Sequence, residues 1–330
     1  MNRSARILLS LSLTLALFAG LVGCTTPSGA PAESPSSTVP AKLRIGTLPT
    51  EDTLPLWVAE RDDLFKKAGI EVEIISFASA QERDAALTAN AIDGFMGDLI
   101  AAASLRAGGV PVKVATVMLG ATPAEGRFGI AVKPGSKVTS LEGLADKPIG
   151  TSSGTIQEYV LDQLMIQAGV SPEQIKKEEV KKVPVRFELL MSGKLEAAAL
   201  PEPFLSLAEK TGAKVVADDA GDSNLSQTVL VFAGAFLDEP AGAAAVTKLL
   251  GVWDEAVAVI NKDPNAFRAL LVEKARLPKP LESTYKVNTY PTAQLPKKEQ
   301  VEDVLDWMKG SGLLTKEVTF RDLTWTPPAK

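Results

Sequence analysis

From residue 43 to residue 233, short apolar runs of strand length alternate with longer segments that read as helices. Residues 54–68 carry a helical pattern that Gly69 ends, and residues 70–75 follow as a strand. Because strands separated by helices pair in parallel, this order predicts an α/β fold with helices covering its sheets. Further strands are expected at 43–46, 92–97, 112–118, 128–132, 148–151, 180–183, 196–200, 214–217 and 228–232, and further helices at 79–90, 99–107 and 155–168.

The pattern changes after Ala233, where helices replace the alternation. Helices are predicted at 240–262, 263–275 and 297–309, and Asp263 begins the second of them as its cap. The simplest architecture is therefore two α/β units, with this late helix cluster packed back on one of them.

The N-terminal segment has the pattern of a secretory signal. Arg3 and Arg6 precede an apolar run over residues 7–23, which ends in the letters LVGC at Cys24. This ending resembles the bacterial lipoprotein box, whose cysteine is acylated and becomes the first residue after cleavage. The alternative is a buried cysteine in an uncleaved anchor. Several acyl chains, at about 0.8 kcal/mol per buried CH₂, would hold the protein firmly at a membrane.

Residues 25–41 (TTPSGAPAESPSSTVPA) form a Pro- and Ser-rich stretch without aromatic side chains. Such a stretch cannot bury a core and is expected to be a tether. The sequence thus predicts a signal peptide over 1–23, a lipidated tether over 24–41 and a globular body from Lys42 onward.

The chain of 330 residues contains no histidine and a single cysteine. These counts exclude His-based acid–base catalysis, Ser-His-Asp and Cys-His nucleophile systems, an internal disulfide, and zinc sites built on His or paired Cys. The formal net charge is −5 and no basic run stands out, so nucleic acid is not an expected partner. Neither a metal nor a cofactor is expected.

Residues 150–154 (GTSSG) match the G-x-S-x-G elbow of α/β-hydrolases, and a predicted strand and helix flank them as that motif requires. A serine at the elbow needs a general base, and the chain has no histidine to supply one. The sequence therefore argues against a hydrolase and favours a binding role for Ser152.

Two predicted strands end in similar letters, Ile-Gly-Thr, at Gly46 and at Gly150. Each is followed by a polar loop and a helix, and the loops are residues 50–53 and 152–155. In open α/β sheets ligands bind beyond the carboxyl ends of the strands, where helix N-termini offer free amides. Two such loops on two domains could face each other across a cleft; the alternative is that both are ordinary helix caps.

Four stretches resemble the type II periplasmic-binding-protein family, as found in ABC importers for aliphatic sulfonates, nitrate and thiamine precursors. They are LRIGTLPTEDTLPLWVAERDDLFKKAGIEVEI, ANAIDGFMGDLIAAASLRAGG, PIGTSSGTIQEYVLDQLMIQAGV and LLMSGKLEAAALPEPF. The resemblance implies an α/β fold of two domains, with a ligand cleft between them and two crossing strands near 129–133 and 228–233. Domain 1 would comprise 42–130 and 231–330, and domain 2 would comprise 131–230.

The resemblance also implies a set of ligand-binding residues: Thr50, Asp52, Thr53, Asp98, Arg127, Ser152, Ser153, Thr155 and Glu202. Arg127 could meet an anion or be a solvated loop arginine. The family's aromatic-Asp-Pro turn reads LPEP here, which leaves the role of Glu202 open. Five aromatic residues could form apolar walls of the cleft, although core packing is the expected place for each: Trp57, Phe95, Phe128, Tyr159 and Phe204.

Carboxylates bear on the charge of the solute. Glu51, Asp52, Asp98 and Glu202 all fall near the expected cleft edges. Unpaired carboxylates in a dry cleft would repel an anion by several kcal/mol. This favours a neutral or cationic ring, such as a thiamine-type pyrimidine, over nitrate or a sulfonate, unless Asp52 or Asp98 caps a helix and is screened.

The expected function is that of a lipid-anchored, extracytoplasmic solute-binding protein, monomeric, which delivers a small solute to an ABC permease and ATPase. Two alternatives stay open: a sensory lipoprotein that feeds no transporter, and an exported enzyme on the same scaffold.

Replacing the expected acylation site tests the membrane anchor. The Cys24→Ser variant is expected to lose acylation and to move from the membrane fraction to the soluble fraction of the cell envelope, because the tether offers no other anchor. Cell fractionation with mass spectrometry of the mature N-terminus measures both. A variant that stays acylated and membrane-bound contradicts the assignment.

Overall fold

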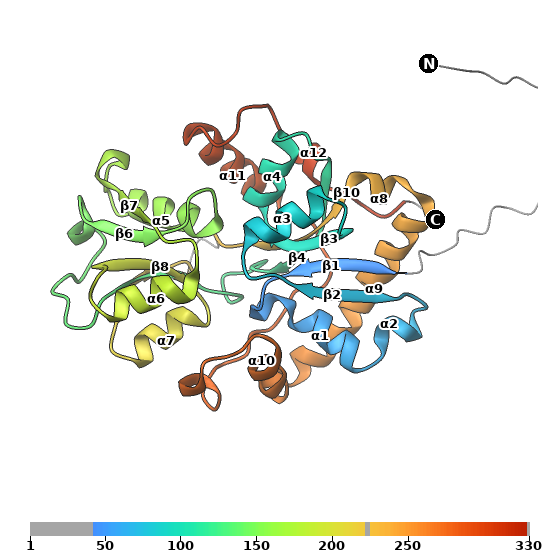
Figure 1. Cartoon of the computed structure of the whole chain (residues 1–330), viewed down its shortest axis with the longest axis horizontal. Helices are drawn as coiled ribbons and strands as arrows, with labels where there is room; N and C mark the ends of the chain where they lie inside the picture. The colour runs from blue at the N-terminus through green and yellow to red at the C-terminus, as the bar shows by residue number, and fades with distance from the viewer. Residues whose placement is uncertain (1–41, 222–224, 329–330) are drawn as a thin grey trace, which may run out of the picture. The chain divides into compact units, whose positions relative to one another are not determined.

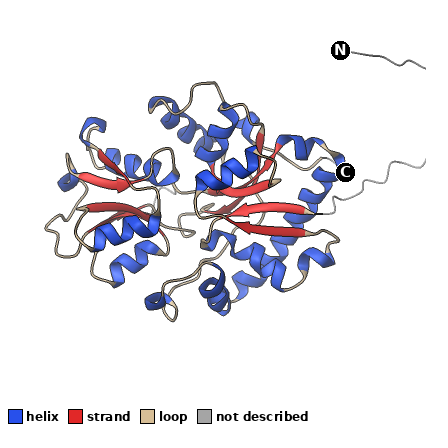
Figure 2. Ribbon diagram, in the orientation of Figure 1, coloured by secondary structure: helices blue, strands red, loops and turns tan. Residues whose placement is uncertain are grey.

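The computed structural model describes residues 42–221 and 225–328. The signal peptide, Cys24 and the tether lie outside these residues, so their assignment stays a prediction. Two five-stranded sheets, each flanked by helices, organise the described part of the chain (Figure 1, Figure 2). In this part no helix combines the length and the apolar character that a membrane crossing needs.

The first sheet and its helices are called lobe 1. Its strand order is β2-β1-β3-β10-β4, with all neighbours parallel except that β10 runs antiparallel to both β3 and β4. The strands are β1 Leu43–Thr47, β2 Val72–Ser76, β3 Gly94–Asp98, β4 Val112–Leu119 and β10 Thr228–Ala233. The helices are α1 Leu54–Arg61, α2 Leu64–Lys67, α3 Ala80–Thr88, α4 Leu99–Ala107, α8 Gly234–Asp238, α9 Pro240–Lys262, α10 Arg268–Lys274, α11 Lys298–Gly310 and α12 Phe320–Leu323.

The second sheet and its helices are called lobe 2. The sheet has the equivalent order β7-β6-β8-β5-β9, and here β5 is the strand that runs antiparallel to its two neighbours. The strands are β5 Phe128–Val132, β6 Pro148–Thr151, β7 Lys176–Glu179, β8 Ala197–Pro201 and β9 Lys214–Asp218. The helices are α5 Ile156–Gln167, α6 Val183–Met191 and α7 Phe204–Lys210. Single turns of 3₁₀ helix lie at Glu51–Thr53, Glu142–Leu144, Pro172–Gln174, Pro264–Phe267 and Lys279–Leu281.

The chain passes between the lobes earlier than the sequence predicts. Strand β5 lies wholly in lobe 2 and β10 wholly in lobe 1, so the crossings precede these strands, and their described residues are 120–127, 219–221 and 225–227. The expected crossings near 129–133 and 228–233, and the domain boundaries inside these strands, are therefore misplaced. The reason is that both strands are apolar enough to be buried at the centre of a sheet, which leaves the polar segments before them to make the crossings.

Two further predictions are wrong for local reasons. The strand expected at 180–183 lies instead at Lys176–Glu179, an exposed edge strand of charged residues that hydrophobic patterning cannot detect. The helix expected over 54–68 breaks into α1 and α2, because Asp63 adopts a left-handed conformation with φ of 56°. The predicted helix at 240–262 is confirmed by α9, with the same bounds.

The segment after β10 packs mainly on lobe 1. Helix α9 contacts α1, α11 contacts α4, and α12 contacts β4. Side chains of α11 and of the turn after Leu281 also reach lobe 2. Trp307 contacts Tyr159 of α5, and Thr284 accepts a hydrogen bond from Lys210 of α7.

The pairing of β3 with β10 requires a glycine at position 94. A Cβ atom there would lie 2.7 Å from the Val231 carbonyl oxygen and would also overlap the Phe232 ring. Gly94→Ala is expected to lower the free energy of unfolding by roughly 1–3 kcal/mol through overpacking. Urea titration measures it, with Gly251→Ala in α9 as the matched control.

A Cβ atom at Gly251 would meet no atom within 4 Å, so the control should be neutral or stabilising by up to about 1 kcal/mol. Equal urea midpoints for the two variants would contradict the close approach of β3 and β10.

Candidate functional site

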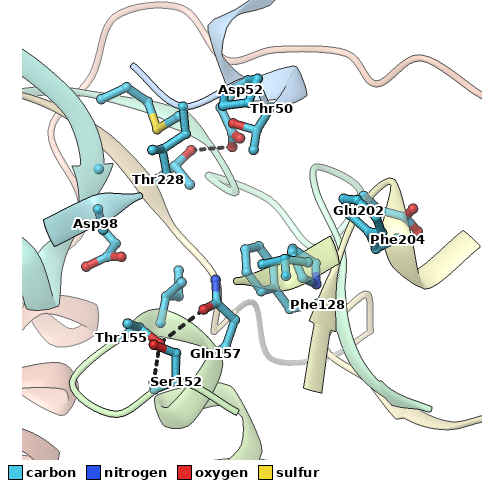
Figure 3. Close-up of a pocket in the computed structure, with 18 of the residues that line it drawn as sticks. Thr50, Asp52, Asp98, Phe128, Ser152, Thr155, Gln157, Glu202, Phe204 and Thr228 are labelled. Carbon is cyan, nitrogen blue, oxygen red and sulfur yellow. Dashed lines mark hydrogen bonds between the residues drawn. The ribbon is translucent and has the colours of Figure 1, made fainter. Parts of the chain in front are cut away.

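A cavity of about 220 Å³ lies between the two lobes (Figure 3). Its walls come from the carboxyl ends of β1 and β3 in lobe 1, from the loops after β6, β7 and β8 in lobe 2, and from Gly126 and Arg127 of the first crossing segment. Parallel strands place their carboxyl ends at one edge of a sheet, which explains why residues far apart in the chain gather here.

Thr50 and Asp52 form the lobe 1 wall next to β1. The Asp52 carboxylate accepts a hydrogen bond of 2.8 Å from the Thr228 hydroxyl of β10, as Figure 3 shows. The Thr50 hydroxyl lies buried in the same wall without a hydrogen-bond partner among the described residues. Sequence reasoning missed Thr228, because nothing local connects it to Asp52.

Glu51 lines the same wall and also anchors this loop. The Tyr290 hydroxyl donates to the Glu51 carbonyl oxygen and the Asn288 amide donates to its carboxylate, each at 2.8 Å. Burial, and then the neighbouring carboxylate of Asp52, raise the pKa of Glu51 well above its usual range. The segment before α11 therefore holds the polar loop of lobe 1 in place.

Asp98 ends β3 and begins α4. Its carboxylate accepts a hydrogen bond of 2.7 Å from the Ala101 amide, so it caps the helix as well as lining the cavity. Burial raises the pKa of Asp98 despite this bond. The two readings of Asp98, helix cap and cavity wall, thus hold together.

The lobe 2 wall is the start of α5. Ser152, Thr155 and Gln157 line the cavity, and the Thr155 hydroxyl donates to the Ser152 carbonyl oxygen at 2.6 Å. No side chain caps the first turn of this helix. Gln157 was not expected from the sequence, although its position in the first turn after the polar loop is a signal that could have identified it.

Two of the expected binding residues lie outside the cavity wall. Thr53 is fully buried, and its hydroxyl donates to the Leu48 carbonyl oxygen at 3.3 Å. Ser153 is exposed, and its hydroxyl donates to the Glu179 carboxylate at 2.6 Å. Both have local structural partners, and the geometry gives neither a contact with a solute in the cavity.

Arg127 is neither a free anion receptor nor a solvated loop residue. It donates at 2.8 Å to Asp218 and at 2.8 Å to Glu209, and it lies 3.3 Å from Glu202. The Glu202 carboxylate also accepts from the Ser206 amide at 3.2 Å and from the Ser206 hydroxyl at 2.9 Å, in the first turn of α7. Burial raises the pKa of Glu202 in spite of these bonds.

The aromatic residues divide between core and cavity. Phe128 and Phe204 line the cavity, whereas Trp57, Phe95 and Tyr159 pack in the cores. Core packing was the expected place for all five, so Phe128 and Phe204 depart from that expectation.

Arg83 of α3 also lines the cavity and was missed by the sequence analysis. It packs over the Phe95 ring at 4.6 Å and pairs with Asp84 at 2.7 Å. Its charge is thus neutralised by a neighbour in the chain.

The sequence pattern of the NMT1-like family matches residues 36–273 of the chain. The chain belongs to the NMT1-like family. A putative ABC transporter periplasmic binding protein of Brachyspira hyodysenteriae is 24% identical over 267 residues, which cover 72% of this chain and 74% of that protein.

Solved structures of periplasmic binding proteins share the fold of this NMT1-like chain. The alkanesulfonate-binding protein SsuA of Xanthomonas axonopodis pv. citri, bound to MOPS, superposes with a TM-score of 0.72 at 19% identity, over 87% of this chain and 99% of that one. The aliphatic sulphonate binding protein SsuA of Escherichia coli gives a TM-score of 0.72 at 20% identity, over 88% and 93%. At these identities the likeness concerns the fold alone.

The fold also occurs in an enzyme. The desulfurization enzyme DSZB superposes with a TM-score of 0.63 at 15% identity, over 86% of this chain and 96% of that one. The fold by itself therefore does not separate binding from catalysis, and the chemistry of the cavity must do so.

Removing Arg127 tests its structural role. Arg127→Gln would leave Glu202, whose side chain is 8% exposed, without its cation, so we expect a loss of roughly 1–3 kcal/mol in the free energy of unfolding at pH 7. Without the cation the pKa of Glu202 rises further. The loss in the free energy of unfolding therefore grows as pH rises and Glu202 ionises, and it shrinks near pH 4, where Glu202 is protonated.

Arg61→Gln is the control, because Arg61 forms a surface pair with Asp62 and its loss should cost well under about 1 kcal/mol. Urea titrations at both pH values measure these differences. Equal deficits for the two variants, or a deficit that does not change with pH, would refute the role of Arg127.

Proposed function

We propose that this protein is the extracytoplasmic solute-binding lipoprotein of an ABC importer. It captures a small organic solute between its lobes and delivers it to a permease that an ATPase drives. The observation that carries the proposal is the cavity, whose walls are two strand–loop–helix junctions, one on each lobe. Each junction alone offers few polar groups, and closure of the lobes combines them and excludes water.

The relatives support an import role. The Brachyspira protein is named as an ABC transporter periplasmic binding protein, and the structural neighbours include alkanesulfonate-binding and nitrate-binding proteins. The N-terminal pattern that ends at Cys24 is in keeping with a protein held outside the cytoplasm by a lipid anchor. We expect the protein to act as a monomer.

The cavity argues for binding rather than catalysis. Ser152, the serine of the G-x-S-x-G elbow, lines the cavity, but its hydroxyl donates no hydrogen bond to a base among the described residues. The chain has no histidine, and the described residues hold no His, Cys, Asp and Glu group suited to a metal ion. Ser152 is therefore suited to donate a hydrogen bond to a solute, not to attack one.

A contact between the lobes bears on closure. The Trp307 indole of α11 donates a hydrogen bond of 3.0 Å to the Asp162 carboxylate of α5, and its ring lies 5.3 Å from that of Tyr159. Lys177 also donates to Asp162, at 2.7 Å. Because α11 otherwise packs on α4 of lobe 1, this bond joins the lobes at a distance from the cavity wall.

Trp307→Phe tests closure without touching the cavity. Losing the indole N–H should cost about 1 kcal/mol of the closed form and weaken solute binding roughly fivefold. The solute is first identified by native mass spectrometry of protein purified from its host. Calorimetry then gives its affinity, and solution scattering gives the change in radius of gyration on binding.

Trp253→Phe is the matched control, because its indole donates to the Pro291 carbonyl oxygen at 2.9 Å within lobe 1. It should lower stability and leave solute affinity unchanged. A protein that binds no solute, or that is no more compact when bound, contradicts the proposed function. Equal affinities for the two Trp variants contradict only the role of Trp307.

A further inference from the structure

The cationic side chains beside Asp52 and Asp98 are already occupied by carboxylates. Arg83 pairs with Asp84 at 2.7 Å and also donates to the Met96 carbonyl oxygen at 2.8 Å. Arg127 is surrounded by three acids of lobe 2. An anionic solute on this side of the cavity would have to displace one of these acids.

Two carboxylates of lobe 1, by contrast, have only neutral hydrogen-bond donors. Asp52 accepts from the Thr228 hydroxyl, and Asp98 accepts from the Ala101 amide at the start of α4. Neither receives a hydrogen bond from Lys or Arg among the described residues. Lobe 1 therefore presents unpaired carboxyl groups to the enclosed space, and a cation bound beside them would favour their charged form.

Lobe 2 presents the opposite polarity. Helix α5 has 12 residues, and no described group accepts from the amides of Ile156 and Gln157 in its first turn. Ser152 lines the cavity beside them, as Figure 3 shows, is only 2% exposed, and its hydroxyl makes no hydrogen bond to a described residue. An uncapped helix start with a buried, unpartnered hydroxyl is suited to an anion or a strong acceptor.

Charges near this helix start reinforce the difference. Lys181 and Lys182 line the cavity from the loop before α6. The nearby Glu158 carboxylate binds the Gly154 amide and is paired with Lys177 at 2.8 Å. The acid next to the start of α5 is thus neutralised, unlike Asp98 at the start of α4.

We propose that the solute is a zwitterion, with a protonated nitrogen against Asp52 and Asp98 and an anionic group against Ser152 and the first turn of α5. Phe128 and Phe204 line the cavity between the two polar walls and would cover a short apolar linker. The inference rests on the proposed function and specifies its substrate class. A solute with one charge would leave the opposite wall desolvated and unpaired, which disfavours closure on it.

The test compares matched probes. One set is 3-aminopropane-1-sulfonate, propane-1-sulfonate and propylamine; a second set has the same three charge types on a phenylethyl skeleton. Thermal unfolding and calorimetry are run with the full mature chain at low salt. At least one zwitterion is expected to bind about tenfold or more tighter than both of its singly charged counterparts.

Two variants test which end of the solute lies against which wall of the cavity. Asp98→Asn keeps a helix cap at α4 and should reduce the preference for the zwitterion over the sulfonate about tenfold. Ser152→Ala should weaken the zwitterion and the sulfonate severalfold, with no effect on the amine. The controls are Asp322→Asn, which removes a capping carboxylate at α12, and Ser153→Ala, next to Ser152 but outside the cavity.

The inference is overturned if a sulfonate or an amine binds more tightly than the matching zwitterion. It is also overturned if Asp98→Asn leaves the preference for the zwitterion unchanged. Either result leaves the proposed solute-binding function intact. Absence of binding by every probe also overturns it. If the protein from its host then carries no solute either, the proposed function fails as well.

Discussion

Each sheet contains one antiparallel strand between parallel ones, and the rest of the structure depends on how this strand is inserted. Strand β10 lies between β3 and β4, and β5 lies between β8 and β9. Each enters its sheet directly from the other lobe, so the two crossing segments are drawn together. The Asp219 amide donates to the Phe128 carbonyl oxygen, and the Phe128 amide donates to the Asp219 carboxylate at 2.7 Å. The Gln227 side-chain amide donates to the Gly120 carbonyl oxygen at 3.2 Å. The carboxyl ends of both parallel sets then face one cavity.

The two lobes repeat one architecture with different electrostatics. In each, a strand that ends in Ile-Gly-Thr leads through a polar loop to a helical turn at the cavity. In lobe 1 buried carboxylates line the wall, and Asp98 caps its helix. In lobe 2 the helix start is uncapped, and nearby acids are paired with Lys177 and Arg127. The same scaffold in both lobes can thus bind two different ends of one small molecule. The reason is that the charge of each cavity wall depends on helix caps and ion pairs rather than on the strand order.

Hydrophobic periodicity predicted most of the elements, since burial of one face produces it in both helices and buried strands. Helix α9 was predicted with its observed bounds, and β5 likewise. Hydrophobic periodicity did not predict the features that do not arise from burial. Strand β7 is exposed along its whole length, and its backbone pairs with β6 regardless of its charged side chains. The break at Asp63 depends on one backbone conformation that composition does not reveal.

By itself the sequence determined the α/β class, the two polar loops after Gly46 and Gly150, and the absence of a histidine base, because these follow from local pattern and composition. Only the tertiary structure decided which of the polar residues face the cavity. Ser152 and Ser153 are neighbours, yet one lines the cavity and the other binds Glu179. Arg127 meets Asp218 across 91 residues of sequence, and Asp52 meets Thr228 across 176. Such partners are set by how strands from distant segments are placed side by side, and no local signal in the chain encodes them.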